Sequence, residues 1–141
     1  MLSAIDHVQL AAPAGSEERL RPYYTGALGM SELEKPPVLA ARGGCWFARG
    51  AVQLHIGIEG DFRPARKARP GIRVSGIDTL AARITAAGAV VTWDTNLPGH
   101  RRFFSEDPVG NRLEFLEPVP VPEPVTGPAA EPEPVRGGPA A

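Results

Sequence analysis

The sequence predicts an α+β domain made of two tandem βαβββ modules. The expected order is a strand, a helix and three strands, and the same order then repeats. Gly29 and Gly88, which each end a predicted helix, are 59 residues apart. His55 and Glu114, each in the last strand of its half, are also 59 residues apart. A repeat of this length indicates two similar units. Each unit would pack one sheet face against its helix and leave the other face concave.

The first half begins with alternating polar and apolar residues, which are typical of a strand. A helix follows, because Ser16 can cap its start, two acids come next, and Gly29 can end it. Pro22 should kink this helix or delay its start, since proline lacks a backbone N–H. The expected strands lie at residues 4–11, 30–34, 44–49 and 52–58, with a loop at residues 35–37.

The second half follows a basic connector at residues 60–68. Asp78 can cap a helix that ends at Gly88. The segment DPVGN, which starts at Asp107, predicts a turn, because proline fixes φ while glycine and asparagine tolerate left-handed backbone. The expected strands lie at residues 70–75, 90–93, 102–104 and 112–116, with a loop at residues 96–99 that runs on to His100.

Composition favours one soluble domain. The chain has 141 residues, of which 43% are hydrophobic and 22% charged. A net charge of −1 argues against nucleic-acid binding, and no apolar run is long enough to span a membrane. No signal peptide is evident, and Cys45 has no partner for a disulfide, so we expect a cytoplasmic protein.

Proline is concentrated near the C-terminus. Eight of the sixteen prolines lie in residues 118–141, a segment without an aromatic residue. Such a segment buries too little apolar surface to offset its ordering entropy. We therefore predict a folded domain at residues 1–118, with modules at about 4–60 and 69–118, and a disordered tail at 119–141. The tail is expected to be a solvated appendage, and a site for a proline-binding partner is the alternative.

Polar residues gather on the strand faces opposite the apolar ones. A sheet face in contact with water is the ordinary explanation for polar residues, but such faces usually carry lysine, threonine, serine and glutamate. Histidines, arginines and a carboxylate at matching places in both modules favour a pocket. A set of two histidines and one carboxylate suits Zn²⁺, Fe²⁺, Mn²⁺ or Ni²⁺. The polar residues are His7, Gln9, Gln53, His55, Arg69, Arg73, Arg112 and Glu114.

Four motifs resemble the vicinal oxygen chelate superfamily, which includes glyoxalase I, extradiol dioxygenases, fosfomycin resistance enzymes and bleomycin resistance proteins. They are IDHVQLAAP, YYTGALGM, VQLHIGIE and DPVGNRLEFLEP, and the resemblance covers about residues 4–118. It implies a curved, cup-shaped mixed β-sheet with helices on the outer face. It also implies that His7, His55, Arg69 and Glu114 occupy the positions of the metal ligands. Arg69 departs from the usual histidine, and a guanidinium has no lone pair for a metal.

The resemblance leaves three functions open. The first is a pocket without a tightly held metal that binds a small, anionic organic molecule. Arg69, Arg73 and Arg112 would contact the anion, Trp46 and Phe104 could stack on a ring, and Gln9 and Gln53 would complete the pocket. The second is an enzyme that holds a divalent metal through His7, His55 and Glu114. The third is an interaction domain that uses the Pro-rich tail.

For the metal enzyme, Glu114 would be either a ligand alone or both a ligand and the proton shuttle, in lyase, isomerase or ring-cleaving dioxygenase chemistry. The resemblance further implies a homodimer, because modules of different chains often close one cleft in small members. Five cations are expected at the rim or in solvent, and they are Arg63, Arg66, Lys67, Arg101 and Arg102.

Overall fold

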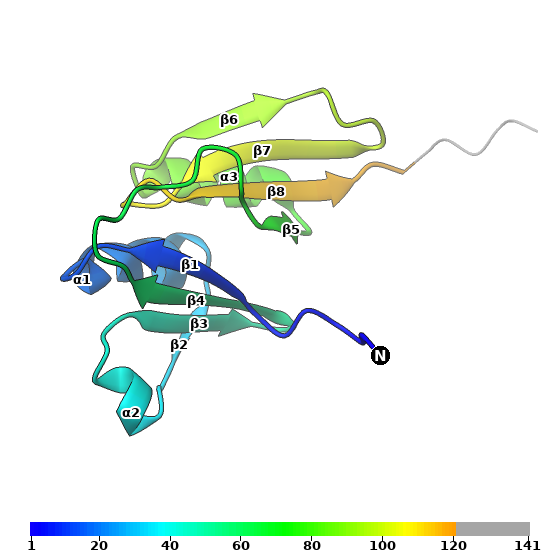
Figure 1. Ribbon diagram of the computed structural model, residues 1–141. Coiled ribbons are helices and arrows are strands. Elements are labelled where there is room, and N and C mark those ends of the chain that lie inside the picture. The colour runs from blue at the N-terminus through cyan, green and yellow to red at the C-terminus, as the bar shows by residue number, and fades with distance from the viewer. Residues whose placement is uncertain (121–141) are drawn as a thin grey trace, which may run out of the picture.

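The computed structural model describes residues 1–120. The predicted tail at residues 119–141 lies outside the described residues, apart from its first two. Residues 1–120 form two four-stranded mixed sheets with the same topology, in the orders β1-β4-β3-β2 and β5-β8-β7-β6 (Figure 1). The predicted α+β fold with two βαβββ modules is confirmed.

The first module contains the elements β1 (Val8–Ala12), α1 (Glu17–Arg21), η1 (Pro22–Ala27), β2 (Ser31–Leu33), α2 (Pro37–Ala40), β3 (Cys45–Arg49) and β4 (Val52–Ile58). The second contains β5 (Gly71–Arg73), α3 (Ile77–Ala86), β6 (Val91–Asp94), β7 (His100–Glu106) and β8 (Arg112–Pro118). Strand register shows the duplication directly. Gln9 pairs with His55 in the parallel pair β1–β4, and Gly71 pairs with Glu114 in the parallel pair β5–β8.

The first helix differs from the prediction in its geometry. Helix α1 ends at Arg21, and Pro22 begins the wider π-helix η1. Pro22 has no N–H to continue the α-helical bonding, and the N–H of Leu28 reaches back to the carbonyl of Tyr23 at 2.9 Å. The wide turn places both Tyr23 and Tyr24 in the core.

Both predicted side-chain caps are wrong. Ser16 precedes α1 as predicted, but its hydroxyl donates to the carbonyl of Pro13 at 2.6 Å and caps no helix N–H. Helix α3 begins directly after Gly76, so Asp78 lies inside the helix and does not cap its start. The carboxylate of Glu117, from β8, accepts the N–H groups of Gly76 and Ile77 at 3.0 Å each. A residue distant in sequence therefore satisfies the helix start.

Several boundaries also differ from the prediction. Strand β1 begins at Val8, so His7 precedes it, and β5 is limited to Gly71–Arg73. Residues 37–40 form the short helix α2, which the sequence did not predict. Pro37, from the predicted loop at residues 35–37, stands in its first turn, a position that tolerates proline. Strand β7 begins at His100, which was assigned to the preceding loop.

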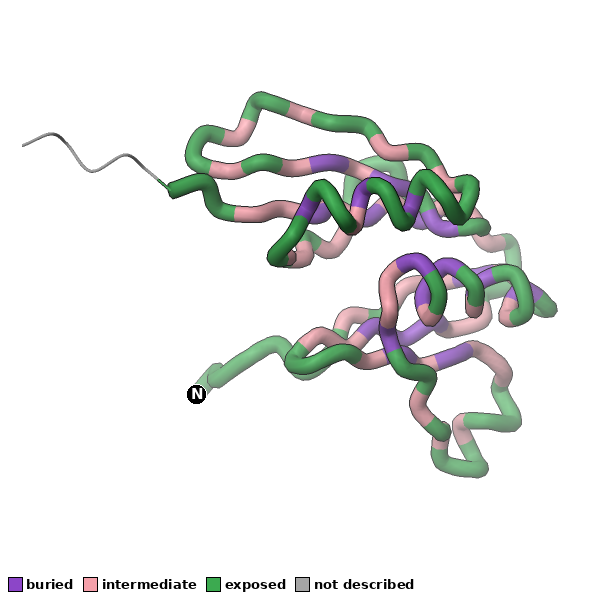
Figure 2. Tube along the Cα trace, turned by 180° about the vertical axis from the view of Figure 1, so that it is seen from behind, coloured by how far each residue is buried: buried purple, intermediate pink, exposed green. Residues whose placement is uncertain are grey.

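The core lies between the helices and the two sheets. Figure 2, seen from behind, shows α3 and the segment of α1 and η1 in front of the sheets, with buried residues along them. The largest fully buried side chains include Leu20, Tyr24, Phe47, Leu54, Ile56, Ile84, Phe103, Leu113 and Phe115. The polar strand positions lie on the opposite face of each sheet, so the core fixes where the candidate site is.

Asp107, in the predicted turn, joins the two modules. Its carboxylate accepts the hydroxyl of Tyr24 at 2.7 Å, the N–H of Val109 at 3.0 Å and the N–H of Asn111 at 2.9 Å. The Asn111 side chain in turn donates to the carbonyl of Ala11 at 2.8 Å. Burial, and then the charge of Asp107, raises the pKa of Tyr24 well above its ordinary value, so Tyr24 stays a donor. This buried link holds β8 against the first module.

Among residues 1–120, no helix has the length and apolar character that crossing a bilayer requires.

Candidate functional site

The inner face of the first module carries a stack of three aromatic rings. His55, on β4, lies between Trp46 and His7, at 4.2 and 4.0 Å between ring centroids and with interplanar angles of 11° and 14°. Trp46 is the cross-strand partner of His55 in the pair β3–β4. His55 is only 6% exposed. The stack therefore holds both histidine rings parallel to the ring of Trp46.

The environment of His55 favours its uncharged form. Burial lowers the pKa of His55, and the nearby ring of His7 lowers it further. The Gln53 side-chain oxygen lies 3.4 Å from Nε2 of His55, while Nδ1 of His7 lies 2.8 Å from a carboxylate oxygen of Asp6. A neutral imidazole can accept a proton or ligate a metal.

The inner face of the second module carries a charged network in place of the rings. Glu114, at the position that matches His55, accepts hydrogen bonds from Arg102 at 2.7 Å and Arg69 at 3.3 Å. Arg102 also donates through Nε to Asp94 at 2.6 Å. The four side chains are between 14% and 20% exposed. Glu114 is thus already satisfied by two guanidinium groups.

Phe104 lies beneath three guanidinium groups. The central carbon of Arg112 is 4.2 Å from the ring centroid, that of Arg69 is 4.7 Å away and that of Arg102 is 5.1 Å away. Glu114 and Asp94 balance two of these charges. Arg112 makes only a long bond, at 3.4 Å, to the carbonyl of Arg66. The cluster therefore retains one positive charge, held in place by cation–π contact.

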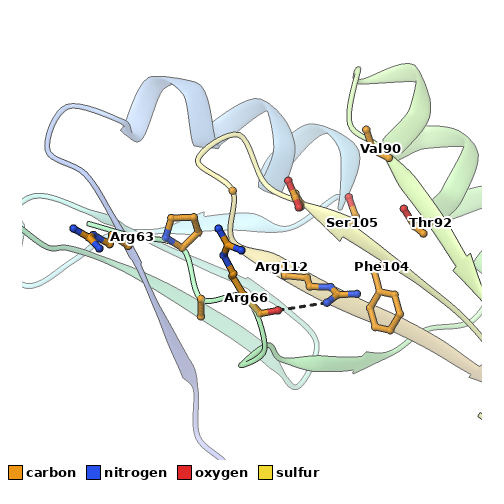
Figure 3. Close-up of a pocket in the computed structure, with 11 residues that line it drawn as sticks. Arg63, Arg66, Val90, Thr92, Phe104, Ser105 and Arg112 are labelled. Atoms are coloured by element: carbon orange, nitrogen blue, oxygen red, sulfur yellow. Dashed lines mark hydrogen bonds between the residues drawn. The ribbon is translucent and has the colours of Figure 1, made fainter. Parts of the chain in front are cut away.

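A cavity of about 800 Å³ adjoins this cluster (Figure 3). Arg112 and Phe104 line it from β8 and β7, Thr92 lines it from β6, and Arg63 and Arg66 line it from the connector. One acid, Glu106, is part of the wall. The two connector arginines, expected at the rim or in solvent, thus contribute to a basic cavity.

The structure distributes the predicted site residues over four places. His7, His55, Gln53 and Trp46 gather in the first module, and Arg69, Arg112, Phe104 and Glu114 gather in the second. Gln9 lines a cavity of about 600 Å³ between β1 and β5, together with Arg69 and Arg112. Arg73 borders neither cluster and lines a separate groove.

Arg102 is a site residue that the sequence analysis missed, because it was placed with the rim charges. Its position two residues before Phe104 in a strand puts both side chains on one face, and this alternation was the available signal.

The donor set of one chain does not fit a resident metal. Within residues 1–120, no three His, Cys, Asp or Glu side chains form a group that could hold a metal ion. His7 and His55 pair with each other, whereas two arginines engage Glu114.

Comparison with solved structures identifies the family. The crystal structure of a glyoxalase family protein from Bacillus anthracis matches with a TM-score of 0.81 and 44% sequence identity, over 84% of this chain and 98% of that chain. This chain belongs to the vicinal oxygen chelate superfamily and, within it, to the glyoxalase family.

Two more distant structures share the fold alone. TnmS3, an antibiotic binding protein from Streptomyces sp. CB03234, has a TM-score of 0.63 at 24% identity, over 84% of this chain and all of that chain. The fosfomycin resistance protein FosX from Listeria monocytogenes has a TM-score of 0.67 at 13% identity, over 84% of this chain and 96% of that chain. No family profile matches the sequence, and no curated protein matches it.

Proposed function

We propose that this protein binds a small organic anion on the inner face of the second module. The proposal rests on the guanidinium of Arg112, whose positive charge is not balanced by Glu114 or Asp94. This group is held over Phe104 at the wall of a basic cavity. A guanidinium has five N–H donors and matches a carboxylate or phosphate in two parallel bonds. Arg112 uses one donor in a long bond, so its other donors can serve a ligand.

Arg63 and Arg66 also favour a negatively charged ligand. Both line the cavity with Arg112, and the single acid there, Glu106, leaves an excess of positive charge in its wall. A cavity with one sign of charge attracts the opposite sign. Phe104 serves mainly to position the guanidinium groups, whereas the sequence analysis had suggested that it stacks on a ligand ring.

Calorimetry and thermal unfolding with benzoate, phenylphosphonate and neutral benzyl alcohol test the proposal. The two anions should bind and raise the melting temperature, because a ligand that prefers the native state stabilises it. Arg112→Gln should weaken anion binding by about tenfold, the equivalent of one charge-assisted contact. The control Arg42→Gln removes the same charge from an exposed position and should leave binding unchanged. Equal binding of benzyl alcohol, or unchanged binding by Arg112→Gln, would contradict the proposal.

We also propose that a homodimer completes the site. Each chain holds two different polar faces, and in a twofold dimer the aromatic stack of one chain can face the charged network of its partner. Such a pairing would bring His7 and His55 to Glu114 of a second chain. Sedimentation over a hundredfold range of concentration should show a dimer. A monomer at all concentrations would refute this arrangement.

A metal-dependent enzyme is the second candidate, and the adjacent rings of His7 and His55 favour it, because imidazole nitrogens are good ligands for Zn²⁺, Fe²⁺, Mn²⁺ and Ni²⁺. Metal analysis of the wild type beside Arg69→His distinguishes the candidates. Stoichiometric metal in the wild type supports an enzyme in which Glu114 is a ligand or proton shuttle. Metal in Arg69→His alone supports the binding protein.

We further propose that the protein is cytoplasmic and that its folded domain ends near residue 118. A partner-binding role of the Pro-rich tail is the third alternative. Limited proteolysis with mass analysis tests the limit, and a stable fragment that ends far from residue 118 would contradict it.

A further inference from the structure

A groove of about 670 Å³ crosses the boundary between the modules, away from the cavity of Figure 3. Its walls come from the end of η1 and the turn between β3 and β4 in the first module, and from β5 and α3 in the second. It shares no lining residue with the Arg112 cavity. The groove is therefore a separate place for a ligand.

The floor of the groove is apolar. Met30 and Phe115 are buried there, at 7% and 2% exposure, and the other floor residues are half-buried side chains that pack against the core. The apolar lining residues, here called the floor, are Leu28, Met30, Val52, Ile72, Val74, Leu80 and Phe115. Such a surface suits an aliphatic chain, since removing apolar area from water is the main source of affinity.

Two arginines converge above this floor. Nη1 of Arg49 donates to the carbonyl of Gly29 at 2.9 Å, and Nη2 of Arg83 donates to the carbonyl of Gly26 at 2.7 Å. A Cβ placed on Gly29 would lie 2.8 Å from Nη1 of Arg49 and 3.4 Å from Nη2 of Arg83. Both guanidinium groups thus approach one point, although their charges repel. Arg73 lines the same groove from the end of β5.

No carboxylate balances these charges among residues 1–120. The ion pairs of the described residues involve none of Arg49, Arg73 and Arg83, and no acid lines the groove. Each guanidinium has five donors, and Arg49 and Arg83 each use one donor on a backbone carbonyl. Converging cations with unused donors form a site for an oxyanion.

We propose that this groove binds an amphipathic anion, namely an aliphatic carboxylate. Its head lies between Arg49 and Arg83, and its chain lies on the apolar floor. The proposal is independent of the anion site at Arg112, because the two cavities have no residue in common.

Decanoate, below its micellar concentration, is the probe. Calorimetry should give saturable binding of decanoate to the full chain. Decanol, which lacks the carboxylate, and propionate, which lacks the long aliphatic chain, should each bind at least about tenfold more weakly. Arg49→Gln and Arg83→Gln should each weaken decanoate by about tenfold, while Arg42→Gln, at an exposed position outside the groove, should not. Backbone amide NMR of the wild type should show the largest shifts near Gly29, Ile72 and Leu80.

Three results would overturn the proposal. They are decanol binding as tightly as decanoate, full affinity in Arg83→Gln, and NMR shifts centred on Phe104 and Arg112. If Arg49→Gln or Arg83→Gln fails to fold, the wild-type NMR map and the comparison with decanol still decide the outcome. Failure here would leave the benzoate experiment on the other cavity unaffected.

Discussion

The two modules share one topology and register, yet their inner faces carry different chemistry. At matching positions the first module has His55 in a stack of rings, and the second has Glu114 between two guanidinium groups. The convex faces, in contrast, both bury leucine, isoleucine and phenylalanine under a helix. The comparison shows that the buried face maintains the repeat, while the inner face is free to acquire a function.

The largest expected effect comes from removing the buried link between the modules at Asp107. Asp107→Ala should lower the free energy of unfolding by about 3 kcal/mol or more, because buried donors of Tyr24 and Asn111 lose a charged acceptor. Urea unfolding measures the change. Tyr24→Phe, which removes one of these bonds, should cost about 1–2 kcal/mol. A loss below 1 kcal/mol for Asp107→Ala would show that the link is dispensable.

A smaller effect is expected from the charged network of the second module. Glu114→Gln should lower the free energy of unfolding by about 1–2 kcal/mol, because two partly buried guanidinium groups lose their carboxylate. A double-mutant cycle in urea should give stronger coupling of Glu114 with Arg102, at 2.7 Å, than with Arg69, at 3.3 Å. The reverse order would mean that Arg69 is the main partner.

The smallest effect should appear in the first module as a dependence on pH. Since burial depresses the folded-state pKa of His55, the unfolded state binds a proton more readily. The stability from neutral His55 is present above the unfolded pKa of about 6.5 and declines as the pH falls toward the lower folded value. Melting temperatures between pH 7.5 and 5 should fall less in His55→Phe than in the wild type. Identical pH profiles would contradict this assignment.

The fold was predictable because strand alternation depends on neighbouring residues and because the 59-residue spacing is visible in the sequence itself. These patterns also placed His55 and Glu114 on inner faces and identified the Asp107 turn. Non-local effects escaped prediction. Glu117 replaces the expected caps at the start of α3 only because β8 ends beside that helix.

Site residues were harder to predict than elements, because alternation gives the face of a strand but not the partner across space. The alternation places Arg73 on the same face as Arg69, yet Arg69 precedes β5 and Arg73 ends it, and the two side chains line different cavities. The histidines and Glu114 share a kind of face but belong to different sheets, so one chain does not bring them together.

The π-helical turn that begins at Pro22 constrains the number of residues in this segment of the chain. A π-helical turn accommodates one more residue than an α-helical turn, so it behaves as a single-residue insertion. Deleting one residue between positions 22 and 27 would restore a regular helix, in which the segments on either side keep their orientation but residues within the former π-turn change their position around the helix axis. Tyr24 would then no longer point toward Asp107, so the length of this short segment is constrained by a contact made 83 residues away.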